Sequence, residues 1–78
     1  MYGRAASALE RYIERYPDET ESWYLLGEAN RQQGGAEHEK KAEESYLKAL
    51  SIDADHANSH KMLGIMRLKA GDKAAARE

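Results

Sequence analysis

The stretch that decides the fold spans residues 23–50 and reads WYLLGEANRQQGGAEHEKKAEESYLKAL. Its apolar residues recur every three or four positions, the spacing that places side chains on one face of a helix. Gly34 and Gly35 interrupt this pattern, and glycines at such a point favour a helix stop with a left-handed C-cap. The stretch therefore predicts two helices joined by a tight turn, over residues 19–33 and 37–52.

A further helix is predicted before this hairpin, over residues 3–16. An apolar stripe on one helical face supports it, made of Ala5, Leu9, Tyr12, Ile13 and Tyr16. The stripe stops at Pro17, which cannot continue a helix. Asp18, followed three residues later by Glu21, then predicts an Asp version of the capping box at the start of the next helix.

A fourth helix is predicted after the hairpin, over residues 56–70. Asp55 is its expected N-cap. Gly71 is its expected stop, and residues 72–78 are expected to begin another helix. Helix-forming residues dominate the chain and β-branched residues are few, so the predicted fold class is all-α.

The helical pattern repeats along the chain. An offset of 37 residues aligns Ala5 with Ala42, Asp18 with Asp55, Ser22 with Ser59, Leu26-Gly27 with Leu63-Gly64, and Gly34 with Gly71. These shared residues are the predicted helix caps and the small residues at helix crossings. Gly27 and Gly64 are therefore expected where two helices approach closely, and Trp23 is expected to fill the space beside them.

This spacing resembles the tetratricopeptide repeat, a helical hairpin of about 34 residues. The resemblance rests on Trp23-x-x-Leu26-Gly27, on Ala42-x-x-x-Tyr46-x-x-Ala49-Leu50, and on His60-x-x-Leu63-Gly64. It implies antiparallel helix-hairpin repeats stacked as a right-handed superhelical solenoid segment.

The resemblance also implies how the single domain over residues 1–78 is divided. The expected units are the second helix of a partial repeat over 1–18, a full repeat over 19–55 and a truncated repeat over 56–78. The full repeat carries an insertion of three residues, since Gly34 to Ala42 spans 8 positions and Gly71 to Ala76 spans 5. We expect the insertion to lengthen a helix by about one turn. The incomplete end units suggest a fragment of a longer array.

Composition excludes several functional classes. A chain of 78 residues without cysteine has no disulfide framework, no thiolate nucleophile and no cysteine zinc site. The 12 Lys and Arg against 14 Asp and Glu give a net charge of −2, which argues against nucleic acid as a partner. No apolar run is long enough for a membrane span or a signal peptide, so we expect neither. We expect a cytoplasmic location.

Catalytic motifs are missing from the sequence as well. It has neither a G-x-S-x-G nucleophile elbow nor a phosphate-binding loop, so we expect no enzyme, no catalytic residues and no cofactor. His56 and His60 have the i, i+4 spacing of helical zinc sites, but Ala57 stands where such a site has its glutamate. We therefore predict no metal site.

The remaining candidate site is a groove that the resemblance implies on the concave side of the stacked helices. Its candidate residues are Glu21, Tyr24, Leu25, Glu28, Arg31, Gln32, Asn58, Lys61, Met62, Ile65, Leu68 and Lys69. The alternative is that some of them only pack against a neighbouring unit. The implied function is a scaffold module for protein–protein interaction that binds a peptide or a partner protein.

Charge suggests the partner's chemistry. Lys61 and Lys69 flank apolar side chains, which favours an acidic amphipathic peptide whose basic end lies toward Glu21 and Glu28. A homodimer is also predicted through unpaired apolar faces of the end units, formed by Leu9 and Ile13 and by Met66 and Leu68. The alternative function is a repeat region appended to a larger enzyme, for example a peptidase or transferase, which the flanking sequence would reveal.

Overall fold

The computed structural model describes residues 2–77, with side chains described for residues 3–69 and 71. Its helices are α1 (Tyr2–Arg15), α2 (Thr20–Gln33), α3 (Ala36–Ile52) and α4 (Ala57–Arg77). They make up 85% of the chain, and the described residues contain no strand. The all-α fold of helical hairpins is confirmed, and the observed helix bounds lie within one residue of the predicted ones except at the end of α4.

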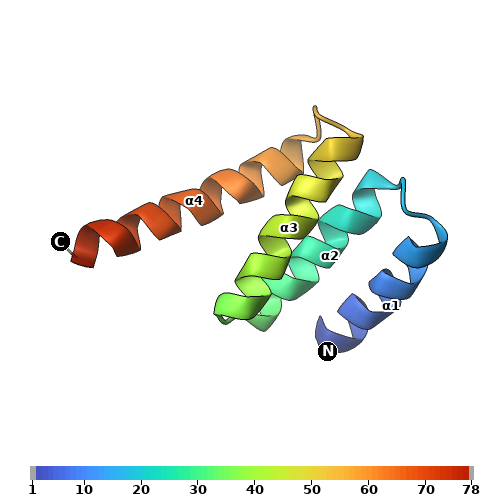
Figure 1. Ribbon diagram of the computed structural model, residues 1–78, viewed down its shortest axis with the longest axis horizontal. Helices are drawn as coiled ribbons and strands as arrows, with labels where there is room; N and C mark the ends of the chain where they lie inside the picture. Colours follow the sequence, from blue (N-terminus) through green and yellow to red (C-terminus); the bar gives the residue numbers. More distant parts are fainter. Residues whose placement is uncertain (1, 78) are drawn as a thin grey trace.

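The helices form a row in which each packs against the next (Figure 1). α2 lies between α1 and α3 and runs antiparallel to both, so α1 and α3 run in the same direction. α4 packs on α3, and its C-terminal half extends away from the other helices (Figure 1). The row measures 45 × 29 × 14 Å, and it is thin enough for each inner helix to keep sides that no other helix covers.

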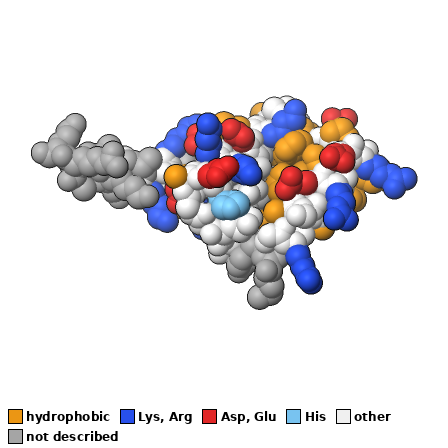
Figure 2. All heavy atoms as spheres, turned by 60° about the horizontal axis from the view of Figure 1, so that its bottom comes forward, with side chains coloured by type: hydrophobic (Ala, Val, Ile, Leu, Met, Phe, Trp, Pro, Cys, Tyr) orange, Lys and Arg blue, Asp and Glu red, His pale blue; other side chains and the backbone are white. Residues whose placement is uncertain are grey.

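The core between α1 and α2 corrects the predicted apolar stripe. It consists of the buried residues Ala6, Ile13, Leu26 and Ala29, with Leu9 and Trp23 packed against them. Ala5 is exposed, and Tyr12 and Tyr16 are 43% and 47% exposed. Each residue along a helix points about 100° away from the one before it. α2 covers only the narrow strip of α1 that contains Ala6, Leu9 and Ile13. Hydrophobic side chains consequently reach the surface among charged ones at this end of the molecule (Figure 2).

Tyr46 lies at the centre of the second core. It is fully buried together with Ala42 and Leu63, and Tyr24, Leu50, Met62 and Met66 pack around this cluster. The Tyr46 hydroxyl donates a hydrogen bond of 2.5 Å to Oε1 of Glu28 on α2. The Tyr24 ring lies 5.9 Å from the Tyr46 ring, between centroids. One aromatic side chain therefore joins α2, α3 and α4.

Gly27 confirms the predicted close approach of two helices. A Cβ atom at this position would lie 2.6 Å from Cε1 of Tyr46. The prediction for Gly64 is wrong, because nothing beyond its chain neighbours and the adjacent backbone of α4 lies within 4 Å of the corresponding position. The reason is that the other side of α4 packs on α3, through Leu63 and the residues around it.

The turn between α2 and α3 confirms the predicted helix stop. Gly34 and Gly35 have φ angles of 75° and 85°, in the left-handed region that other residues avoid. The Gly34 N–H donates to the Arg31 carbonyl and closes the last turn of α2. Ala36 begins α3 directly afterwards, so the residues between Gly35 and Ala42 are helical, and α3 has 17 residues.

Two predicted helix signals are wrong. α2 begins at Thr20 after Glu19, and no side chain caps its first amides, so Asp18 and Glu21 form no capping box. α4 continues through Gly71 to Arg77, so this glycine is not a stop. A single glycine inside a helix costs only about 1 kcal/mol, and the alanine-rich residues that follow favour helix.

Tyr46 gives the fold a predicted sensitivity to alkaline pH. Burial, followed by the hydrogen bond to the Glu28 carboxylate, raises the pKa of the Tyr46 hydroxyl well above its ordinary value of 10.0. The unfolded chain ionises this tyrosine near pH 10, whereas the folded chain keeps it neutral. The resulting stabilisation is complete below about pH 10 and decreases as the pH rises above that value.

We therefore expect the free energy of unfolding to fall more steeply between pH 9 and pH 11 for the natural chain than for Tyr46→Phe. Urea denaturation at a series of pH values measures both slopes. Tyr12 and Tyr24, whose pKa values are also raised, titrate in both proteins, so the difference isolates Tyr46. Parallel slopes would contradict the prediction.

Candidate protein-binding face of α2 and α4

The residues predicted to line a groove lie on α2 and α4, and the structure divides them into two groups. The exposed group consists of Glu21, Leu25 and Gln32 on α2, and of Asn58, Lys61, Ile65, Leu68 and Lys69 on α4. The half-buried group consists of Tyr24, Glu28, Arg31 and Met62. We call the exposed group the α2–α4 face.

The half-buried group has structural contacts. Tyr24 and Met62 pack on the cluster around Tyr46. Glu28 accepts the Tyr46 hydroxyl through one carboxylate oxygen, and its other oxygen lies 3.3 Å from Nη2 of Arg31. These four residues therefore pack within the chain itself, whereas the alternative raised from the sequence was packing against a further unit, and that alternative stays a prediction. For Glu28 and Arg31 the packing is within one repeat.

The α2–α4 face leaves large apolar side chains uncovered. Leu25 is 44% exposed, Ile65 is 42% exposed and Leu68 is 69% exposed. Lys61 and Lys69 are exposed on the same helix as Ile65 and Leu68. The α4 part of the face therefore combines apolar contact area with positive charge.

The predicted dimer faces need a correction. Ile13 is buried at 6% exposure, because α2 covers it, and Leu9 and Met66 are half-buried. Leu68 is the member of that set that presents most of its surface. The prediction that Ile13 forms part of an unpaired apolar face is therefore wrong, whereas the homodimer itself stays a prediction.

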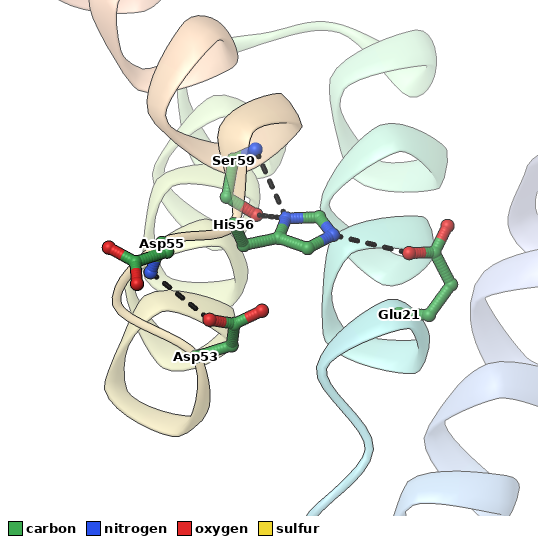
Figure 3. A network of polar contacts seen from close by, with 5 residues as sticks. All are labelled: Glu21, Asp53, Asp55, His56 and Ser59. Carbon is green, nitrogen blue, oxygen red and sulfur yellow. Dashed lines mark hydrogen bonds and ion pairs between the residues drawn. The ribbon is translucent and has the colours of Figure 1, made fainter.

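His56 connects the two helices of this face (Figure 3). Its Nδ1 accepts a hydrogen bond from the Ser59 backbone N–H at 3.2 Å, and the Ser59 hydroxyl lies 2.7 Å from the same nitrogen. Its Nε2 lies 3.2 Å from Oε2 of Glu21 on α2. Since Nδ1 acts as the acceptor, Nε2 carries the proton and donates it to the carboxylate. The ring also lies 5.3 Å from the Tyr24 ring, between centroids.

His56 also replaces Asp55 as the N-cap of α4. The backbone N–H of Asp55 donates to Oδ1 of Asp53 at 3.1 Å, within the turn (Figure 3). Because His56 directly precedes Ala57, its imidazole reaches the third amide of the helix, the position at which a capping side chain binds. We considered this histidine as a metal ligand from its sequence and predicted no metal site. Its place just before the helix was the signal for a cap.

The two histidines of the predicted helix start have different partners. The ring of His60 is exposed and its Nε2 lies 2.6 Å from the Ala54 carbonyl oxygen, to which it donates. His56 points instead toward Glu21. Among the side chains that the structure describes, no group of three or more His, Cys, Asp or Glu residues could hold a metal ion.

The helices of the described part of the chain are too short or too polar to span a membrane.

Comparison with known proteins gives one family. The family model described as Tetratricopeptide repeat matches residues 2–38, which include α1, α2 and the first residues of α3. No curated protein and no solved structure matches the chain. The match over residues 2–38 and the row of helical hairpins both agree with the sequence resemblance, and they support a tetratricopeptide repeat assignment and a generic protein-interaction repeat module.

Proposed function

We propose that the α2–α4 face binds an acidic, amphipathic peptide segment of a partner protein. The observation that carries the proposal is the exposure of Ile65 and Leu68 beside Lys61 and Lys69 on α4. Apolar side chains of a peptide gain binding energy by covering Ile65 and Leu68, and carboxylates of the peptide pair with the two lysines. Leu25 adds apolar contact area on α2.

The charges of the face also give the peptide a direction. Glu21 is 64% exposed at the side chain and has one carboxylate oxygen paired with His56, whereas both carboxylate oxygens of Glu28 are paired, with Tyr46 and Arg31. Glu21 is therefore the better partner for a basic residue of the peptide. The acidic part of the peptide then lies along α4, and any basic residue lies over α2.

Binding without catalysis is part of the proposal. The two carboxylates among the groove candidates both have structural partners, since Glu28 accepts a hydrogen bond from Tyr46 and Glu21 accepts one from His56. The same face would also serve the alternative function, a repeat region attached to an enzyme, because it could bring a substrate or regulator to a catalytic domain. A catalytic motif in flanking sequence would favour that alternative.

A charge-reversal experiment tests the proposed face. Peptides selected on the natural chain from a random display library are measured again with the double variant Lys61→Glu, Lys69→Glu. Acidic peptides are expected to lose affinity on the order of tenfold, and the salt dependence of their binding is expected to weaken. Isothermal titration at two salt concentrations measures both effects.

The matched control is Lys40→Glu with Arg67→Glu. It makes the same change in net charge at exposed positions outside the α2–α4 face, so the affinity should stay close to that of the natural chain. Equal losses in both double variants would show a non-specific charge effect and contradict the proposal. Sedimentation of the chain without peptide tests the predicted homodimer, since a second copy on the face would give a species of twice 8.8 kDa.

A further inference from the structure

A groove lies on another side of α2 than the α2–α4 face. It has a volume of about 490 Å³ and is bounded by α1 and α3, with α2 between them. The α2 residues that line it are Trp23, Leu26 and Asn30, none of which belongs to the α2–α4 face. We call it the α1–α3 groove.

The floor of this groove is apolar. Ile13 and Leu26 are buried there, and the half-buried ring of Trp23 lies beside them. The indole N–H of Trp23 donates to the Pro17 carbonyl at 2.8 Å, so its polar atom already has a partner. The Lys48 ammonium lies 5.8 Å from the centre of the ring. An apolar side chain entering the groove would therefore meet carbon surface and no unpaired polar group of the indole.

The two walls carry different charges. Glu10 and Glu14, one helical turn apart on α1, form an acidic wall. Lys41, Glu44 and Lys48 on α3 form a wall with a net positive charge. All five side chains are exposed, and in the described part of the chain no ion pair joins the walls. A ligand can pair with both walls without first breaking a salt bridge.

From this arrangement we propose that the α1–α3 groove binds an amphipathic helix of a partner protein. Its apolar stripe would lie on Ile13, Trp23 and Leu26, its basic flank along Glu10 and Glu14, and its acidic flank along the lysines of α3. The occupant is a helix because the lining residues run along α1 from Glu10 to Glu14 and along α3 from Lys41 to Lys48, so the groove follows the axes of these helices. Residues one turn apart on a bound helix match the spacing of Glu10 and Glu14.

A second copy of this chain is a poorer occupant. Its most exposed apolar side chains on α4 are Ile65 and Leu68, and the charged neighbours on that helix are Lys61, Arg67 and Lys69. Such a helix would bring positive charge to both walls. At the α3 wall this charge would be repelled by Lys41 and Lys48. The mixed charge of the groove favours a helix with one basic and one acidic flank.

The test uses designed peptides and the fluorescence of Trp23, which is the only tryptophan in the chain. The probe is a tryptophan-free helical peptide of about 18 residues, roughly five turns, with leucines on one face, lysines on one flank and glutamates on the other. Two companion peptides carry lysines on both flanks or glutamates on both flanks. The mixed peptide is expected to shift Trp23 emission to shorter wavelength and to bind on the order of tenfold more tightly than either companion.

Wall variants make the test specific. Glu10→Lys with Glu14→Lys makes both walls basic and should switch the preference to the glutamate-flanked peptide. Lys41→Glu with Lys48→Glu should switch it to the lysine-flanked peptide. The control Lys40→Glu with Arg67→Glu should keep the preference for the mixed peptide, and circular dichroism checks that each variant is folded.

Three results would overturn the proposal. The first is that the wall variants fold normally and leave the ranking of the peptides unchanged. The second is that the ranking changes with Lys61→Glu and Lys69→Glu, which would place the peptides on the α2–α4 face. The third is that Trp23 emission shifts with protein concentration alone, which would identify a second copy as the occupant. Loss of binding at the α2–α4 face leaves this test unaffected, because the two surfaces use different residues.

Discussion

Tyr46→Ala is expected to lower the free energy of unfolding by about 3–5 kcal/mol, the range measured for removing a buried aromatic side chain. Tyr46 is fully buried, and its ring fills the space between α2, α3 and α4. The change also removes the hydroxyl that donates to Glu28. A loss of this size is a large fraction of the stability of a small domain, so the variant should be largely unfolded at room temperature.

Tyr46→Phe is the control that separates the ring from its hydroxyl. It keeps the packing and removes one hydrogen bond to a carboxylate, an interaction worth about 1.5–3 kcal/mol. Urea denaturation followed by circular dichroism measures all three proteins. A midpoint for Tyr46→Ala equal to that of Tyr46→Phe would mean that the ring contributes little, and would contradict the central position given to it here.

Gly27→Leu is expected to destabilise the fold by about 3 kcal/mol or more, at the upper end of the range for overpacking. Even a Cβ atom at this position would lie 2.6 Å from the Tyr46 ring. The ring cannot move aside easily, because it is buried on all sides and its hydroxyl is held by Glu28. Thermal unfolding monitored by circular dichroism measures the loss.

Gly64 supplies a matched control for this prediction, since it occupies the corresponding place in the repeat. Nothing beyond its chain neighbours and the adjacent backbone of α4 lies within 4 Å of a Cβ atom at this position, so Gly64→Ala should stabilise α4 by about 0.5–1 kcal/mol. Gly27→Ala should destabilise the natural chain and become much less harmful in a Tyr46→Leu background. Equal effects of Gly27→Ala and Gly64→Ala would rule out the clash with Tyr46.

Local signals predicted some helix ends and missed others for a physical reason. Gly34 and Gly35 both take positive φ, so the backbone itself requires glycine there and the sequence shows the stop plainly. Position 71 is also a glycine, but its backbone is helical and does not require one, so α4 continues through it. Asp55 was a reasonable cap by residue type, but the imidazole of His56 accepts the hydrogen bond from the third amide of α4.

The candidate site was predictable only as a set of helix faces. Helical spacing correctly grouped Lys61, Ile65 and Lys69 on an exposed side of α4. It could not show that Glu28 pairs with Tyr46, because these residues are 18 positions apart and meet only when α2 packs on α3. The α1–α3 groove was missed for the same reason, since it needs three helices to form.

The row of hairpins has a consequence for local unfolding. A helix at the end of such a row can separate while its neighbours stay packed, so opening occurs in steps along the chain. α4 packs mainly on α3 and reaches α2 through the contact of His56 with Glu21. That contact joins α4 to α2 without involving α3. A stronger contact raises the free energy needed to detach α4 and brings it closer to the free energy of unfolding the whole domain.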